Sequence, residues 1–153
     1  MASARMVVAQ ELYEERIRMT EIKDYGIKLE DLLSGKAAPP PQGTRLDGYF
    51  QGEITGVRLN GTIVGIDYAC VRADGDSRLH VHARITTTDN HSISFFADGA
   101  FFPEPGTGRL QLRENVTLHS TSAAYAWVNR LQIWATGWLD LAAGTITFNG
   151  YEA

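Results

Sequence analysis

Cysteine is nearly absent from this chain, which has only Cys70 among its 153 residues. A single cysteine excludes an internal disulfide and any zinc site that needs several thiolates. Basic runs are also absent: the chain has 14 Lys and Arg against 18 Asp and Glu, a formal net charge of −4. Binding a phosphate backbone needs clustered basic residues, so we do not expect nucleic acid as a partner.

Long apolar runs are absent as well. No stretch approaches the roughly 18 apolar residues of a membrane span. Glu11, Glu14 and Glu15 stand where a signal peptide needs an apolar segment. We therefore expect a soluble, cytoplasmic protein with no membrane partner. The hydrophobic content of 44% is enough for one compact domain with a sizeable core.

Two zones of different composition follow one another along the chain. Residues 1–45 predict a helical or irregular arm that contains an edge strand near residues 16–25 and a short helix around residues 30–33, closed by Gly35. The three prolines of residues 39–41 predict an extended connector. Residues 46–153 form the body, in which short β-type runs alternate with turn pairs such as Asp74-Gly75.

The body predicts an all-β protein. Its runs indicate strands near residues 48–58, 61–72, 78–88, 92–98, 111–120, 124–138 and 144–152. With the strand of the arm this makes about eight strands, and no helical pattern in the body could cover a second sheet face. A single antiparallel β-barrel, calycin-like or lipocalin-like, buries their apolar side most simply. The irregular stretch from Gly99 to Gly108 is a candidate lid over the barrel mouth.

One predicted strand carries ionisable residues on a single face. Strict alternation over residues 78–88 places His80, His82 and Arg84 together. A two-residue turn at Asp74-Gly75 sets Asp67 opposite His82, whereas a three-residue turn replaces Asp67 by Tyr68 and Cys70; we favour the first register. The next strand adds Phe96 and Asp98 to this face, with Asp98 opposite His82.

These residues predict acid and base chemistry. A carboxylate beside an imidazole raises its basicity, so His82 oriented by Asp67 is the candidate general base. Arg84 is a candidate for holding an oxyanion, and Asp98 or His80 for returning the proton. Alternatively, the whole face points to water and keeps the sheet soluble. The His-x-His pair also permits a metal with Asp67, but the further ligands of a cupin pattern are missing, and we predict no metal or other cofactor.

A second group of candidates lies near the C-terminus. On the predicted strand 124–138, Tyr125, Trp127 and Asn129 share a face and present two large rings with polar tips and an amide. Such a trio lines a pocket for a flat, partly apolar ligand, or it fills a core. In the pocket interpretation the two rings stack on the substrate and Asn129 assists Arg84.

The chain resembles the domain of unknown function 3237 family. The resemblance spans about residues 46–151, and its most specific element is the run from Tyr125 to Asn129; Gly65-Ile66-Asp67 and the Asp74-Gly75 turn add to it. It implies a calycin-like antiparallel β-barrel and places family positions on Asp67, Tyr125, Trp127 and Asn129. It implies no activity. The family pattern usually has a second glycine where this chain has Ile66, and His80 and His82 are not part of it.

Three functions are compatible with these patterns. The favoured hypothesis is a cofactor-free lyase, isomerase or cyclase that acts by acid and base catalysis on a small hydrophobic or aromatic metabolite inside the barrel. A lipocalin-like carrier would hold the same ligand unchanged, and a scaffold would have a filled core. The arm and an exposed edge of an incompletely closed barrel suggest a homo-oligomer, a dimer or larger.

Overall fold

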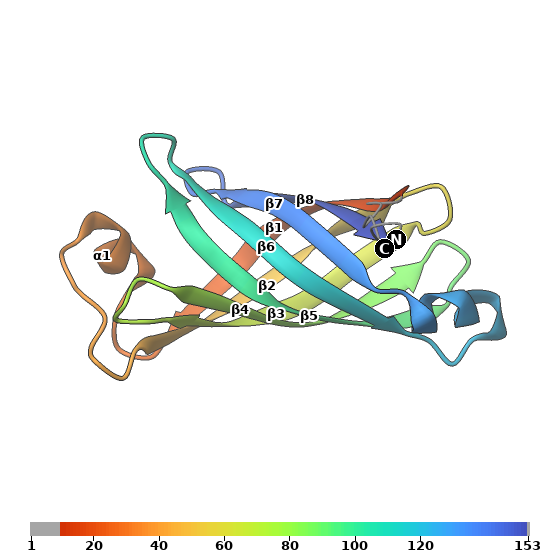
Figure 1. Cartoon of the computed structure of the whole chain (residues 1–153), viewed down its shortest axis with the longest axis horizontal. Coiled ribbons are helices and arrows are strands. Elements are labelled where there is room, and N and C mark those ends of the chain that lie inside the picture. The colour runs from red at the N-terminus through yellow and green to blue at the C-terminus, as the bar shows by residue number, and fades with distance from the viewer. Residues whose placement is uncertain (1–9, 153) are drawn as a thin grey trace, which may run out of the picture.

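The computed structural model describes residues 10–152 and contains eight antiparallel strands closed into a barrel (Figure 1). Each strand pairs with the next in the chain, and β8 pairs with β1 to complete the ring. The strands are β1 (Gln10–Asp24), β2 (Thr44–Thr55), β3 (Gly61–Val71), β4 (Ser77–Thr87), β5 (Ser92–Glu104), β6 (Arg109–His119), β7 (Ile133–Asp140) and β8 (Thr145–Glu152). The all-β barrel predicted from the sequence is confirmed.

Alternation of apolar and polar residues explains why these segments form barrel strands. In β4, Leu79, Val81 and Ile85 are buried inside the barrel, while His80 and His82 between them are exposed. The same period of two recurs in β6, where Leu110, Leu112 and the later alternate positions face inward. One side of every strand can therefore be buried by ring closure alone.

The N-terminal zone contributes a full member of the barrel. β1 pairs with both β2 and β8, so the ring closes and the exposed sheet edge expected from incomplete closure is not found among residues 10–152. The helix α1 (Leu29–Ser34) ends at Gly35, whose φ of 76° gives the predicted glycine cap. Neither helix in the described part of the chain is long and apolar enough to cross a membrane.

Two sequence predictions are wrong. The first half of the strand predicted over residues 124–138 is a 3₁₀ helix, η1 (Ala123–Arg130), and β7 begins only at Ile133. The lid predicted between Gly99 and Gly108 is mostly strand, because β5 continues to Glu104 and β6 begins at Arg109. Pro103 is accommodated in β5, near the end of that strand.

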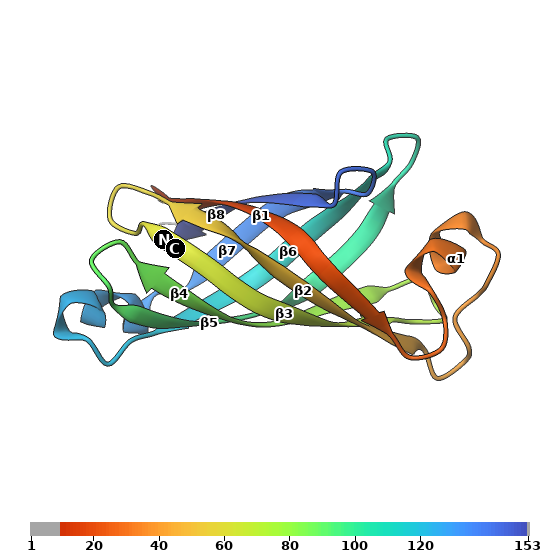
Figure 2. The same ribbon diagram turned by 180° about the vertical axis from the view of Figure 1, so that it is seen from behind.

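The two ends of the barrel differ. Figures 1 and 2 show α1 at one end and η1 at the other. Fully buried aliphatic side chains fill the end near η1: Ile54, Leu59, Ile63, Ile85, Ile93, Val128 and Ile133. The end near α1 lacks such a plug, and it is there that the barrel is hollow.

Candidate functional site

A cavity lies inside the barrel, in the part toward α1. Its volume is about 90 Å³, counted over the positions that the centre of a water molecule can take. That is room for several waters or a small organic molecule. Leu29 of α1 borders it, and its wall is mainly apolar, with Met19, Leu46, Phe50, Leu79, Phe101 and Phe148 among the side chains that form it.

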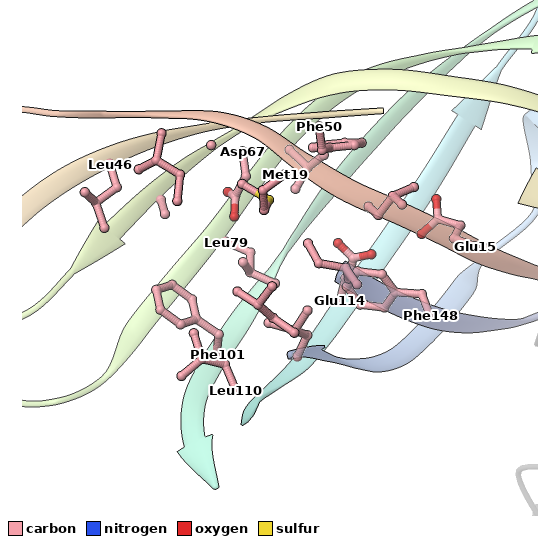
Figure 3. A pocket seen from close by; sticks show the side chains of 18 of the residues that line it. Glu15, Met19, Leu46, Phe50, Asp67, Leu79, Phe101, Leu110, Glu114 and Phe148 are labelled. Carbon is pink, nitrogen blue, oxygen red and sulfur yellow. The ribbon is translucent and has the colours of Figure 1, made fainter. Parts of the chain in front are cut away.

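Three carboxyl groups interrupt this apolar wall. Glu15 of β1, Asp67 of β3 and Glu114 of β6 all line the cavity, and Figure 3 shows the three side chains within it. Each occupies an inward position of its strand, where its neighbours two residues away are mostly apolar. The lining contains no Lys, Arg or His from the described residues. The cavity is therefore acidic, with no countercharge of its own.

Asp67 is held by the backbone of the adjacent strand. The backbone N–H of His80 donates to Asp67 Oδ1 at 2.9 Å. This bond lies where the regular pairing of β3 with β4 is interrupted, between the pairs Asp67↔Val81 and Cys70↔Arg78. Burial raises the pKa of Asp67 to about 6, against the opposing effect of the His80 N–H. Asp67 is thus ionised at neutral pH but more basic than an ordinary aspartate.

The two glutamates lie in a drier environment. Glu15 is 1% exposed and Glu114 is 4% exposed. Burial raises the pKa of Glu15 to about 8. It also raises the pKa of Glu114 well above its usual range, and the charges of Glu15 and Asp67 add to that effect. Glu15 is consequently protonated at neutral pH, and burial shifts Glu114 toward its protonated form, in which it too is a hydrogen-bond donor.

Tyr13 lies next to the glutamates at the filled end of the cavity. It is completely buried, and its pKa is raised first by burial and then by the charges of Glu15 and Glu114. Its ring occupies space left by Gly150, where any side chain would collide with it. Among the described residues, Tyr13 Oη and Glu15 Oε1 have no hydrogen-bond partner. Two buried polar atoms beside the cavity are therefore unsatisfied.

The predicted histidine cluster is on the outside of the barrel. His80, His82 and Arg84 are exposed, and none lines the cavity. His82 lies against Phe96, with ring centroids 4.9 Å apart, and against Tyr68, at 6.0 Å. This face points to water, as the alternative interpretation of the sequence predicted. A catalytic role for these residues stays a prediction, and it would be exercised on the outer wall.

The register favoured from the sequence is wrong. His82 pairs with Ile66 rather than Asp67, and Asp67 pairs with Val81. The connection between β3 and β4 is longer than a two-residue turn: Gly75, with a φ of 83°, donates its N–H to the carbonyl of Arg72. Because one residue of slip exchanges the two faces of a strand, Asp67 faces the lumen while the histidines face outward.

Asp98 and Phe96 also lie on the outer wall. Asp98 pairs with His80, not with His82 as predicted, and His82 pairs with Phe96. Asp98 Oδ1 accepts a weak hydrogen bond from Asn115 Nδ2 at 3.4 Å. The structure thus brings His80, His82, Phe96 and Asp98 together, but it separates them from the carboxylate of Asp67.

Tyr125, Trp127 and Asn129 belong to η1 instead of a strand, and none of them lines the cavity. Tyr125 Oη donates to Asp89 Oδ1 at 2.6 Å, and the guanidinium of Arg58 lies 4.2 Å from the centroid of the Trp127 ring. The amide of Asn129 accepts from the N–H of Ser120 at 2.7 Å and donates to its carbonyl at 2.9 Å. In this arrangement the amide of Asn129 fixes the chain that enters η1.

Sequence reasoning missed Glu15 and Glu114. Their signal was a charged residue at an apolar position of an alternating strand: Glu114 falls between Leu112 and Val116, and Glu15 between Tyr13 and Ile17. Asp67 was identified, but with the wrong partner. Within residues 10–152 no group of three or more His, Cys, Asp or Glu side chains is arranged to hold a metal ion.

Comparison with known proteins gives a family. A family model described as "Protein of unknown function (DUF3237)" matches residues 41–152. No curated protein matches the chain. Among solved structures, a β-barrel-like protein from Acinetobacter baumannii AYE superimposes with a TM-score of 0.75 at 15% identity, over 94% of this chain and 93% of the other.

Two further solved structures are similar. A protein of unknown function from Clostridium acetobutylicum ATCC 824 gives a TM-score of 0.74 at 18% identity, over 94% of this chain and 96% of the other. An enzyme from Penicillium herquei gives 0.62 at 17% identity, over 99% of this chain and 100% of the other. At these identities the likeness shows the fold alone.

Proposed function

This chain belongs to the DUF3237 family of proteins of unknown function, and we propose that it is an enzyme of the lyase, isomerase or cyclase type that acts on a small hydrophobic metabolite in the barrel lumen by proton transfer. One observation carries the proposal. Three carboxyl groups with different affinities for protons face a single, otherwise apolar cavity. Titratable groups whose environments separate their pKa values are the usual pair of acid and base in an active site.

Asp67 is the proposed general base. With a pKa of about 6 it is ionised at neutral pH, yet it binds a proton more tightly than an ordinary aspartate does. A catalytic base works best when its pKa lies near the working pH. The His80 N–H fixes Asp67 Oδ1, so the carboxylate is oriented while its exposed surface faces the cavity.

Glu15 and Glu114 are the proposed acids. Burial raises the pKa of Glu15 to about 8, so Glu15 is protonated at neutral pH, and it raises the pKa of Glu114 well above its usual range as well. In the reaction, Asp67 takes a proton from a carbon next to a carbonyl, and one glutamate gives a proton to the carbonyl oxygen, so that an enol forms with no net change in charge. Return of the carbon proton to the opposite face gives an epimer, and its return to a conjugated carbon gives a double-bond isomer. Addition of the enol carbon to a second carbonyl of the same molecule gives a ring: the π bond of that carbonyl breaks, its oxygen takes the proton from Asp67, and the enol O–H proton returns to the glutamate.

The apolar wall supports this chemistry. Phe50, Phe101 and Leu79 line the cavity, and an apolar surrounding of this kind strengthens the electrostatic interactions between the carboxyl groups and a bound molecule that displaces the water. One barrel of similar fold, from Penicillium herquei, is described as an enzyme. That description is compatible with catalysis in such a lumen. The fold by itself does not select a reaction.

A carrier is the second candidate function. The cavity borders α1 and has a mainly apolar wall, and such a site can hold a small molecule without changing it. Carrier and enzyme share the cavity and differ in whether Asp67 moves a proton of the bound molecule.

Hydrogen exchange separates the two. The neutral bicyclic ketone α-tetralone is incubated with the protein in D₂O near neutral pD, and loss of the proton signal next to its carbonyl is followed by NMR. We expect exchange faster than in buffer, reduced about a hundredfold by Asp67→Asn. The matched control is Asp76→Asn, an exposed aspartate of the β3–β4 connection, which keeps the exchange.

Two results would count against the enzyme. Binding of the ketone with no acceleration of exchange would indicate a carrier. Acceleration that survives Asp67→Asn would show that the base lies elsewhere. Circular dichroism and the thermal midpoint of each variant ensure that a loss of exchange is not a loss of folding.

A further inference from the structure

The carboxyl groups of the cavity do not all lie together: the two glutamates lie at one end, whereas Asp67 lies beside Met19 on the side of Leu46 (Figure 3). Glu15, Glu114 and the adjoining Tyr13 gather at one end, whereas Ile22 and Leu29 border the cavity on the side of α1. Figure 3 shows the carboxyl groups of Glu15 and Glu114 apart from the rings and aliphatic chains around Leu46 and Phe101. A ligand that fits both ends is itself asymmetric.

We propose that the lumen selects uncharged, oxygen-bearing compounds with an apolar body, that their oxygen lies at the Glu15 and Glu114 end with the body directed toward α1, and that carboxylic acids are excluded. This inference rests on the proposed function, since it names the substrate class of the same cavity.

Exclusion of acids follows from the charges of the lining. Three carboxyl groups and no basic side chain of the described residues face the cavity. An anionic head group would lose its hydration and meet Asp67 without a cation to pair with. A carrier of fatty acids neutralises the carboxylate with a basic side chain, whereas this lumen has none among the described residues and adds the negative charge of Asp67. Acids are therefore disfavoured by desolvation and repulsion together.

The glutamates favour an oxygen over an amine. One oxygen of Glu15 is buried without a partner, Glu15 and Glu114 both line the cavity, and a neutral carboxyl has an O–H to donate. A carbonyl, ether or hydroxyl oxygen accepts such a bond, but an ammonium group has donors only. An ammonium at the glutamate end would require Glu15 or Glu114 to ionise although both are almost fully buried, because the ionised carboxylate of Asp67 lies away from that end (Figure 3).

The apolar body of the ligand fits the remaining wall. Met19, Leu46 and Phe101 surround the space between the glutamates and α1. In the proposed orientation the carbon next to the ligand's carbonyl group lies near Asp67, which also lines the cavity. The compound is therefore bound by its body and oriented by a single oxygen.

The test compares three compounds built on one bicyclic skeleton: α-tetralone, the amine with an ammonium group in place of the carbonyl, and the corresponding carboxylate. Their dissociation constants for the full chain are measured at pH 7 by calorimetry. We expect the ketone to bind at least ten times more tightly than the carboxylate and the amine. Equal or tighter binding of either charged compound overturns the inference, as does binding of none of the three.

Two variants of Glu15 test the orientation. Glu15→Gln keeps a hydrogen-bond donor at this position, whereas Glu15→Leu keeps the approximate volume and removes the donor. We expect the first variant to bind the ketone within a few-fold of the original chain and the second to bind it at least tenfold more weakly. The control is Glu53→Leu, an exposed position of β2. Equal affinity of both Glu15 variants, each folded by circular dichroism, would overturn the placement of the oxygen.

The two proposals fail in different ways. If the amine or the acid binds best while the exchange of the ketone still depends on Asp67, the inference on substrate class is wrong and the proposed function stands. If the ketone binds selectively but shows no accelerated exchange, the substrate class stands and the enzyme does not.

Discussion

The carboxylate of Asp67 and the backbone N–H of His80 form a 2.9 Å hydrogen bond, while the imidazole of His80 lies on the outer wall of the barrel, 5.3 Å from that of His82 between ring centroids. The Asp67 carboxylate thus accepts a hydrogen bond from the backbone of β4, and not from the imidazole of His80. The bond anchors the carboxylate inside the lumen and lowers a pKa that burial raises. With a pKa of about 6, against about 8 for Glu15, Asp67 is the proposed base.

Stability should decrease as the pH rises. Glu15 has a folded pKa of about 8 against an ordinary value of 4.5, and Asp67 has one of about 6 against an ordinary value of 3.8. A carboxyl with a raised folded pKa contributes stability that is complete below its unfolded pKa and is lost as the pH rises through the folded one. Each such group changes the free energy of unfolding by about 1.4 kcal/mol per pH unit within its window. Urea denaturation should give a lower free energy of unfolding at pH 8 than at pH 5.

Glu15→Gln isolates the contribution of one group. Because an amide does not titrate, this variant should flatten the dependence on pH between about pH 5 and 8, whereas Glu53→Gln at an exposed position should leave it unchanged. A chain that is equally stable at both pH values, or more stable at pH 8, would mean that Glu15 is not held protonated by the fold.

Tyr13→Phe should leave the protein equally stable or stabilise it. The hydroxyl of Tyr13 is buried without a partner among the described residues, so its removal relieves a desolvation cost and leaves the ring packed against Gly150. Relief of an unsatisfied buried polar group amounts to about 1–3 kcal/mol at most. Tyr125→Phe is the contrast, since it removes a hydrogen bond to Asp89. A marked loss of stability in Tyr13→Phe, measured by urea denaturation, would reveal a structural partner for its hydroxyl.

Asn129→Ala should destabilise the fold without affecting the lumen. The variant loses two hydrogen bonds to the backbone of Ser120, which corresponds to about 1–3 kcal/mol. Asn129→Asp keeps the acceptor and should lose less. The comparison is made by urea denaturation, with Asn149→Ala on β8 as the control, which loses one side-chain hydrogen bond, to Glu11. Unchanged stability together with lost ketone binding would restore the interpretation of Asn129 as a ligand contact.

The fold was accessible from the sequence because its signals are local. Alternating apolar residues and glycine turns mark each strand, and the absence of helical periodicity in the body leaves ring closure as the way to bury one face. The segment 124–130 was misassigned because its aromatic residues suit a strand, whereas Asn129 and Ser120 fix a 3₁₀ helix by contacts that span the loop.

The candidate site could be predicted only in part from the sequence. Asp67 was found, but its partner depended on one residue of register, and the Asp74-Gly75 pair does not specify the length of the turn around it. Glu15 and Glu114 were missed because a charged residue in a strand is usually assigned to the solvent face. The argument for oligomers from an exposed edge does not apply to a closed ring, and the oligomeric state stays a prediction.

Asp67 is proposed to be a half-buried base with a raised pKa inside the lumen. Titration of the side-chain carboxyl carbons by ¹³C NMR measures this directly, with the Asp67 signal identified by its loss in Asp67→Asn. We predict a midpoint near pH 6 for Asp67, moved by addition of α-tetralone. A midpoint near the ordinary value of about 3.9, unaffected by the ketone, would contradict the claim.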